Sequence, residues 1–325
     1  MSYLVAVEDF ETLTASWSGL LRKCGDCSVF LTPQWQKVWW NYWGVGELSL
    51  LGVHCKSELA GVIPLVKQGN KLSLLGSSDV CDYLDFIALP EDAGAICTAA
   101  MDFIDALEWD TFDLYSLSAQ AVALEHFIPL AKDRGYGVQV EQEGVSPQLD
   151  LPSGWEDYLS VLKKKNRHEL KRKLRRLFNE DGVTYYSVSE LANLKRDMDD
   201  FLAMFLTSHE GKADFLTPRM EDFFRGLADS LASSGNLRLY FMEIGGVRVA
   251  AVLGFDYGDT FFLYNSGYDP RYTRLSVGLL LKALCIKESI ASGKRCFDFL
   301  RGSEKYKYQL GGSDYPVYRC IITRN

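Results

Sequence analysis

Three side chains in the second half of the chain could accept a proton in a reaction at neutral pH. His209 stands at the end of a predicted helix, and its ordinary pKa of about 6.5 suits proton abstraction. Asp298 lies in an apolar strand between two phenylalanines, and Glu304 follows that strand. A carboxylate directed from a strand into a cleft can have a raised pKa and act as a general base. The alternatives are a His209 that stabilises the helix dipole and an Asp298 that pairs with Arg301 or Lys307.

The segment before the helix predicted at residues 279–291 has the composition of a phosphate site. Arg271 and Arg274 could form bidentate hydrogen bonds with phosphate oxygens. Ser276 and Gly278 then lead into the helix, whose free backbone N–H groups attract anions. The alternatives are a solvated turn for the two arginines and a close helix–strand contact for Gly278.

A third group of residues is strongly basic. The chain has 35 basic and 43 acidic residues, of which nine basic and one acidic lie in residues 163–176. The rest of the chain therefore has 26 basic and 42 acidic residues, which is a formal charge of −16. This segment is interpreted as a wall for an anionic acceptor, with Lys171, Arg172, Arg175 and the separate Lys307 as substrate-binding residues. A peripheral contact with an anionic membrane surface is a further form of this interpretation. A solvated helix face and a nucleic-acid element are the alternatives.

The elements that must position these residues form a meander, a helix and a strand. Gly245-Gly246 and Gly258-Asp259 are two-residue hairpin signals between runs rich in Val, Phe, Tyr and Leu. The third strand is predicted at residues 260–266, and the helix at 279–291 ends at Gly293. A last strand is predicted at 296–300.

The first half of the chain has the same order of elements. Strands are predicted at 48–53, 59–66, 71–75 and 83–87, a helix at 93–107 and a strand at 111–115. The approach to this helix contains Glu91 and Asp92, which would repel a diphosphate. We therefore assign cofactor chemistry to the second half, and scaffolding and acceptor binding to the first.

Gly and Pro residues mark a boundary near residues 144–154. The predicted domains are 1–146 and 147–325. Within the second domain, helices are predicted at 155–178, 198–209 and 218–232, with a loop at 211–214. The basic segment lies in the first of these helices.

The bulk composition fits a soluble protein of two domains. The chain has 325 residues, 47% hydrophobic and 24% charged, and no apolar run of about 20 residues that would span a membrane. Its N-terminal stretch becomes acidic too early for a signal peptide, so a cytoplasmic location is expected. Eight scattered cysteines do not suggest a disulfide framework, and Cys24 and Cys27 lack the second Cys or His pair of a zinc site. No metal is expected.

Several segments resemble the GNAT acyltransferase superfamily. The Arg274-x-x-x-Gly278-x-Leu-Leu segment looks like a variant of its acyl-CoA pyrophosphate loop, although the usual Arg/Gln-x-x-Gly-x-Gly/Ala spacing is tighter. Further segments resemble its CelD-like group, which is associated with cellulose and exopolysaccharide synthesis, and the layout is similar to that of the Fem-type aminoacyl transferases. These segments are Phe30-Leu31-Thr32-Pro33-Gln34-Trp35, Leu59-Ala60-Gly61-Val62-Ile63-Pro64-Leu65, Tyr268-Asp269-Pro270 and Phe297-Asp298-Phe299-Leu300-Arg301-Gly302.

The resemblance implies an α/β (α+β) fold of two tandem GNAT-like domains, each a mixed, mostly antiparallel sheet flanked by helices. It implies acyl-CoA, with acetyl-CoA as the expected form, as co-substrate. Strand 260–266 would separate from strand 296–300 at Asn265, Ser266 and Gly267, where backbone N–H groups polarise the thioester carbonyl. Tyr306 would protonate the departing thiolate, with Tyr308 as the alternative.

The predicted reaction moves an acyl group to an amine or hydroxyl of a sugar or cell-envelope precursor. The acceptor would be a small or lipid-linked anion, and no specific nucleic acid is expected beyond a tRNA end. One alternative keeps the fold and takes the acyl group from aminoacyl-tRNA. The other is a binding module of the same fold without catalysis. The sequence does not indicate an oligomeric state.

Overall fold

The computed structural model describes residues 2–25, 27–188, 191–208 and 211–324. The chain divides into two compact units. Unit 1 comprises Met1–Val145 and Tyr315–Asn325, and unit 2 comprises Ser146–Asp314. Unit 2 is therefore continuous in sequence, whereas unit 1 contains segments from both ends of the chain.

The strands of unit 1 form a mixed sheet in the order β1-β2-β3-β4-β6-β13. Neighbouring strands are antiparallel except for β4 and β6, which run parallel, and β5 pairs with β3. The strands are β1 (Tyr3–Glu8), β2 (Glu47–Cys55), β3 (Glu58–Gln68), β4 (Lys71–Leu74), β5 (Ile87–Ala88), β6 (Thr111–Ser118) and β13 (Ser313–Thr323).

The helices of unit 1 pack on this sheet through apolar faces. In α1, for example, Leu13, Trp17 and Leu20 are buried, and Asp9 caps its N-terminus by accepting a hydrogen bond from Thr12 N. The helical segments are α1 (Phe10–Cys24), η1 (Val29–Leu31), α2 (Pro33–Trp43), α3 (Ala93–Asp105), η2 (Ala123–Phe127) and α4 (Ile128–Asp133).

The parallel strands β4 and β6 pair through only three residue pairs, and a tyrosine fills the space beyond them. The hydroxyl of Tyr115, on β6, lies within hydrogen-bond distance of two carbonyl oxygens, Leu74 O at 3.2 Å and Gly76 O at 2.9 Å. Asp92 precedes α3 and gives this helix an acidic start. Its negative charge disfavours a bound diphosphate there.

Unit 2 repeats the same strand pattern, in the order β7-β12-β11-β10-β9-β8. Its parallel pair is β11 and β12, and the other neighbours are antiparallel. The strands are β7 (Gly137–Asp150), whose last residues Ser146–Asp150 belong to this unit, β8 (Val183–Val188), β9 (Leu237–Ile244), β10 (Val247–Tyr257), β11 (Thr260–Tyr268) and β12 (Cys296–Asp298).

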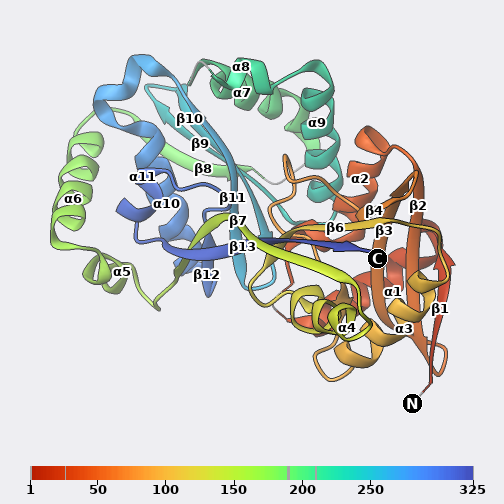
Figure 1. Ribbon diagram of the computed structural model, residues 1–325. Helices are drawn as coiled ribbons and strands as arrows, with labels where there is room; N and C mark the ends of the chain where they lie inside the picture. Colours follow the sequence, from red (N-terminus) through yellow and green to blue (C-terminus); the bar gives the residue numbers. More distant parts are fainter. Residues whose placement is uncertain (1, 26, 189–190, 209–210, 325) are drawn as a thin grey trace. The chain divides into compact units, whose positions relative to one another are not determined.

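Helices cover both faces of this second sheet (Figure 1). Helices α7 and α9 lie on one face, and α10 lies on the other, with α6 packed against α10. The helical segments are α5 (Trp155–Val161), α6 (Lys164–Phe178), η3 (Leu191–Asn193), α7 (Leu194–Thr207), α8 (Gly211–Phe215), α9 (Pro218–Ser233), η4 (Pro270–Leu275), α10 (Val277–Ala291) and α11 (Lys305–Gln309).

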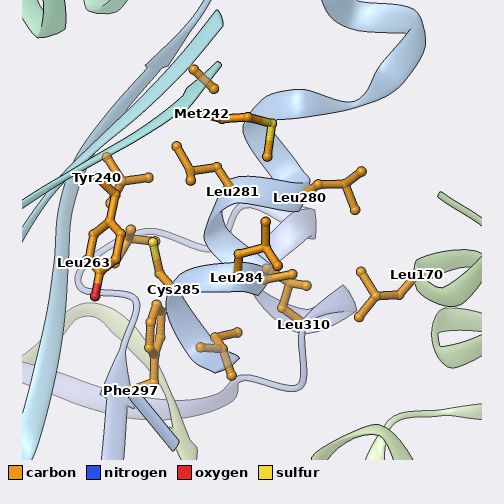
Figure 2. Packing of buried hydrophobic residues seen from close by; sticks show 14 of the residues in the cluster. Leu170, Tyr240, Met242, Leu263, Leu280, Leu281, Leu284, Cys285, Phe297 and Leu310 are labelled. Carbon is orange, nitrogen blue, oxygen red and sulfur yellow. The ribbon is translucent and has the colours of Figure 1, made fainter. Parts of the chain in front are cut away.

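The core of unit 2 is built around α10, which is buried on nearly all sides. Figure 2 shows Leu280, Leu281 and Leu284 of this helix among side chains from the strands, with Leu170 of α6 reaching it from the other side. A helix that is apolar all round requires such burial.

The mixed, mostly antiparallel sheets flanked by helices confirm the predicted fold class. Four predicted elements were wrong in detail. The helix at 155–178 is two helices, because Leu162 and Lys163 adopt extended backbone and Leu162 turns inward to be buried. The strand at 83–87 is reduced to β5, the strand at 296–300 ends at Asp298, and the loop at 211–214 is the short helix α8.

The last strand also differs from the prediction that residues 147–325 form one domain. β13 pairs with β6, and its Val317, Cys320 and Ile322 are buried in unit 1. Arg319 of this strand forms two hydrogen bonds with the buried carboxylate of Asp113 on β6, at 2.9 and 2.8 Å. The segment therefore completes the first unit.

Candidate active site

The candidate site lies in unit 2, whose two parallel strands separate along part of their length. β11 and β12 pair at only three positions, Thr260 with Cys296, Phe261 with Phe297 and Phe262 with Asp298. β11 continues to Tyr268, but β12 stops at Asp298. A register shift in the pairing of β11 with β10 follows directly, opposite Tyr264.

The chain leaves β12 through a left-handed residue that is held on both sides. Leu300 is buried and has φ +60°, which is costly for a residue other than glycine. Asp298 Oδ1 accepts a hydrogen bond from Leu300 N at 2.7 Å. Lys307 Nζ donates to the Leu300 carbonyl at 2.8 Å. This arrangement turns the chain away from β11 and keeps the two strands apart.

The environment of Lys307 contradicts its predicted role in substrate binding. Its side chain is only 2% exposed. Besides Leu300, its ammonium donates to the carbonyls of Arg301 at 2.7 Å and Gly302 at 3.1 Å, and it forms an ion pair with Glu304 at 2.9 Å. All of its donors are used inside the protein, so Lys307 is a structural cation.

Asp298 is likewise held by the protein. The residue is 1% exposed, and its Oδ2 accepts a hydrogen bond from Gln148 Nε2 at 2.9 Å. Its two carboxylate oxygens thus bind β7 on one side and the Leu300 backbone on the other. This geometry matches the alternative of a structural carboxylate more closely than that of a base in an open cleft.

A pocket of about 250 Å³ opens at the N-terminus of α10, next to Tyr268 at the end of β11. Four elements form most of its wall, namely the end of β11, the 3₁₀ helix η4, the start of α10 and the first turn of α11. A fifth contribution comes from α6. The lining residues are Lys173, Tyr268, Thr273, Ser276, Val277, Gly278, Leu279, Lys282 and Tyr306.

Of the predicted site residues, Ser276, Gly278 and Tyr306 meet in this pocket. Ser276 has left-handed backbone angles, φ +59° and ψ +35°, as the residue before α10. Gly278 lies against Tyr268, since a Cβ added to Gly278 would stand 3.0 Å from Tyr268 Cδ1. The predicted close helix–strand contact therefore exists, and the same glycine lines the pocket.

Tyr306 lies on the pocket wall with its ring against buried groups. The ammonium of Lys282 stands 4.8 Å from the centre of its ring, and Phe299 packs edge-on at 6.4 Å between ring centroids. Burial raises the pKa of Tyr306 above its ordinary value. The phenol therefore stays protonated at neutral pH, which is the form that can give a proton.

The other predicted site residues lie outside the pocket wall. Arg271 and Arg274 are exposed on η4, and Arg271 forms an ion pair with Asp269 at 2.6 Å. Of the predicted carbonyl-polarising segment, Gly267 is explained by a helix contact instead. A Cβ at Gly267 would stand 2.5 Å from the carbonyl carbon of Met204 on α7. Asn265 and Ser266 are partly buried on β11 beyond the last pair with β12.

Two predicted bases remain. His209 lies outside the described residues. Glu304 is exposed and forms the ion pair with Lys307 described above. Among the residues that the structure describes, no group of three or more His, Cys, Asp or Glu is placed to hold a metal ion. None of the described helices is long and apolar enough to span a lipid bilayer.

The sequence analysis missed Lys173 and Lys282. Lys282 is 8% exposed, lines the pocket and donates to the Gly278 carbonyl at 3.2 Å. It is a single cation in the run Leu279-Leu280-Leu281-Lys282-Ala283-Leu284, and a charge inside this apolar run was the signal that could have identified it. Lys173 belonged to the basic segment, whose inward-facing positions the sequence did not separate from its exposed ones.

Residues 164–308 match the family model of an acetyltransferase (GNAT) domain. This stretch contains the strands β8 to β12, α10 and the pocket residues. This part of the chain is therefore similar to a GNAT acetyltransferase domain. No curated protein sequence matches the chain.

Solved structures show the same fold along nearly the whole chain. FemX has 11% sequence identity and a TM-score of 0.65, with 98% of this chain and 97% of that chain covered. A C-terminal domain assigned to a lysylphosphatidylglycerol synthetase of Agrobacterium fabrum has 12% identity and a TM-score of 0.62, covering 96% and 92%. A tandem GNAT protein from the clavulanic acid biosynthesis pathway has 10% identity and a TM-score of 0.50, covering 100% and 99%.

Proposed function

We propose that this protein is an acyltransferase that moves an acyl group from acyl-CoA to an amine or hydroxyl group. The observation that carries this proposal is the pocket at the N-terminus of α10, in the unit whose parallel strands β11 and β12 separate after three residue pairs. The match of residues 164–308 to a GNAT acetyltransferase domain supports it. Acetyl-CoA is the donor to test first.

The donor's phosphates would lie against the start of α10. The free backbone N–H groups of this helix favour negative charge, and the Lys173 and Lys282 side chains add cations to the same pocket. Arg271 and Arg274 stand on the exposed turn just before, where they would meet phosphates that extend into solvent. The acyl-pantetheine arm would follow β11 beyond its last pair with β12, along the partly buried Asn265 and Ser266 and the buried Gly267.

The transfer step needs a hydrogen-bond donor, a general base and a general acid. Backbone N–H groups of β11 would polarise the thioester carbonyl, an effect worth about 3 kcal/mol per donor in known oxyanion sites. The acceptor nitrogen or oxygen attacks this carbon and gives up its proton, and the carbon–sulfur bond breaks. The thiolate takes a proton from Tyr306, whose phenol is protonated and lines the pocket. His209, Glu304 and Asp298 remain the candidate bases for the acceptor proton.

We further propose that the acceptor is anionic and belongs to cell-envelope or exopolysaccharide synthesis, as the resemblance to the CelD-like group implies. The exposed cations Lys171, Arg172 and Arg175 of α6 support an anionic acceptor, either a small molecule or a lipid-linked one. Unit 1 would serve as scaffold and contribute to acceptor binding. A cytoplasmic location agrees with the use of acyl-CoA.

Donor binding can be tested by thermal unfolding. Acetyl-CoA at a hundredfold excess over its Kd is expected to stabilise the protein by about 2.7 kcal/mol, whereas adenosine and acetyl-pantetheine, which lack the diphosphate, should not. Release of free thiol in the presence of anionic amino sugars then measures transfer. If no acyl donor stabilises the protein against thermal unfolding, that result would instead support a binding module without catalysis.

A second candidate function keeps the fold and changes the donor. FemX and the synthetase domain superpose with higher TM-scores than the tandem GNAT protein, and the basic face of α6 suits a polyanionic donor. The donor would then be aminoacyl-tRNA. Transfer from charged tRNA in the absence of acyl-CoA would decide for this candidate, and transfer from acetyl-CoA alone would decide against it.

A further inference from the structure

Helix α6 presents a straight row of four exposed polar residues, three of them Lys or Arg, that ends in an exposed phenylalanine. Lys164, His168, Lys171, Arg175 and Phe178 follow one another at spacings of four, three, four and three residues, which places them on one side of the helix. All five are exposed, and 48% of the Phe178 surface is accessible to solvent. We call these five residues the α6 stripe. It is about 21 Å long, given 1.5 Å per helical residue.

The opposite side of α6 packs against the protein core. Leu170 and Leu177 are buried, and Leu174 is partly buried against the same core. Figure 2 shows Leu170 directed toward the α10 cluster, and Figure 1 shows α10 between α6 and the strands. Because one side of α6 is packed against α10, the α6 stripe necessarily faces solvent.

Folding stability does not explain these charges. Lys163, Lys164 and Lys165 stand at the N-terminus of α6, where the helix dipole disfavours cations, and Lys163 makes no side-chain cap. Like charges on neighbouring turns also repel. A helix selected only for stability would have acidic residues at these positions.

The ion pairs that these cations form within the protein are weak. Lys171 pairs with Glu156 at 3.2 Å, and Arg172 pairs with Glu169 at 2.8 Å, in both cases between side chains that are about half exposed or more. Such surface pairs contribute little to stability. Among the residues that the structure describes, Lys164 and Arg175 have no ion pair.

We propose that the α6 stripe docks this protein on an anionic lipid bilayer. The lipid phosphates would contact Lys164, Lys171 and Arg175, and the Phe178 ring would enter the interface between headgroups and acyl chains. Val161, which is 64% exposed just before the start of α6, adds a second apolar contact at the other end of the helix. This inference does not depend on acyl transfer.

The stripe fits a bilayer better than a nucleic acid. An exposed phenylalanine in line with the cations gains free energy in an apolar interface, whereas phosphates of a duplex offer it no apolar contact. The stripe is also straight and convex, as a helix lying on a flat surface requires. A docked α6 would bring the pocket of the same unit to the membrane, where a lipid-linked acceptor is available.

The test is co-sedimentation of the full chain with lipid vesicles. We expect binding to vesicles of equal parts phosphatidylcholine and phosphatidylglycerol, and no binding to phosphatidylcholine alone. The triple variant K164Q/K171Q/R175Q should weaken vesicle binding on the order of 100-fold. Each cation near an anionic surface raises the binding constant about fivefold, and three such cations are lost. Phe178→Ser should weaken binding equally at low and high salt, since its contribution is apolar.

A matched variant controls for the loss of three charges. Lys195, Lys287 and Arg295 are exposed cations of the same unit outside α6, so K195Q/K287Q/R295Q should bind vesicles as the wild type does. Circular dichroism of each variant checks folding. Equal weakening by both triple variants, or no binding of the wild type to anionic vesicles, overturns the proposal. Binding of tRNA by the wild type without vesicle binding would reassign the stripe to nucleic acid.

Discussion

Tyr306 lines the pocket, and its phenol, whose pKa burial raises above the ordinary value, is protonated at neutral pH. Tyr306→Phe should therefore lower kcat by roughly a hundredfold and leave the Kd for acetyl-CoA unchanged, because the proton donor is lost and the ring remains. The wild-type rate should not fall with rising pH until above the ordinary tyrosine pKa of about 10.

Tyr308→Phe provides the matched control for this substitution. The Tyr308 hydroxyl donates to Asp314 at 2.6 Å and does not line the pocket, so its removal should leave kcat within a factor of two or so. If Tyr308→Phe lowers kcat and Tyr306→Phe does not, the thiolate is protonated by the alternative tyrosine. Single-turnover measurements of thiol release distinguish these results.

Lys307 is expected to be essential for stability. Lys307→Met keeps the length of the side chain and leaves the carbonyls of Leu300, Arg301 and Gly302 without their donor. The free energy of unfolding should fall by about 3 kcal/mol, the cost of buried polar groups left unpaired. Lys305→Met, at an exposed neighbour, should change it by less than about 0.5 kcal/mol. Urea unfolding monitored by tryptophan fluorescence measures both, and equal effects would contradict the structural role.

At this scale the sequence identified part of the pocket and left the roles of its residues open. Ser276, Gly278 and Tyr306 meet in the pocket, as their positions around one helix and one strand predicted. The role of Lys307 was wrong because a lysine after a strand looks the same whether its ammonium faces solvent or three backbone carbonyls. That difference depends on the left-handed turn at Leu300, and leucine gives no sign of such a turn.

At the scale of elements, the pairing of β6 with β13 depends on one buried carboxylate. Burial alone would raise the pKa of Asp113, but the guanidinium of Arg319 and the ammonium of Lys71 outweigh it and hold the pKa below its usual range. A carboxyl group with a lowered pKa in the folded state stabilises the fold above its unfolded pKa. That contribution is lost as the pH falls through the folded value.

Asp113→Asn should therefore destabilise the protein most at neutral pH. The expected loss at pH 7 is about 2 kcal/mol, since Arg319 and Lys71 are partly exposed and solvent screens part of the interaction. The difference between wild type and variant should shrink below about pH 4, as the wild-type carboxyl takes up its proton. Urea titrations at pH 3, 5 and 7 test this, and a difference that is constant across the three would contradict the ion-pair explanation.

The boundaries of elements show where sequence patterns stop being informative. Helix α9 and the strands β9 to β11 follow periodic apolar patterns and tight Gly turns, and their predicted positions agree with the structure. The break between α5 and α6 has neither Gly nor Pro. It arises because Leu162 is buried beside Gly311, a contact between distant parts of the chain that no local pattern contains.

At the scale of the whole molecule, both units use one strand plan. In each, four antiparallel strands are followed by a parallel neighbour and then by an antiparallel strand from elsewhere in the chain. The sequence predicted the shared order of strands, helix and strand. It did not predict that β13 completes unit 1, because pairing between strands about 200 residues apart leaves no local signal.

Ending the chain at Asp314 should damage unit 1 selectively. Removal of Tyr315–Asn325 deprives β6 of its neighbour and Asp113 of Arg319. Hydrogen exchange of the truncated protein is expected to be faster by roughly tenfold or more in β6, and unchanged in β9 and β10 of unit 2. Equal loss of protection in both units would show that they unfold together.

The position of β13 in the chain also sets an order for biosynthesis. The ribosome makes most of unit 1 first, then all of unit 2, and only afterwards the strand that covers β6. Until that strand emerges, β6 is an unpaired edge strand with apolar residues. Such an edge in a nascent chain can pair with the wrong segment. Unit 2 has every strand it needs before translation reaches this point, so we expect the unit that is begun second to reach its native state first.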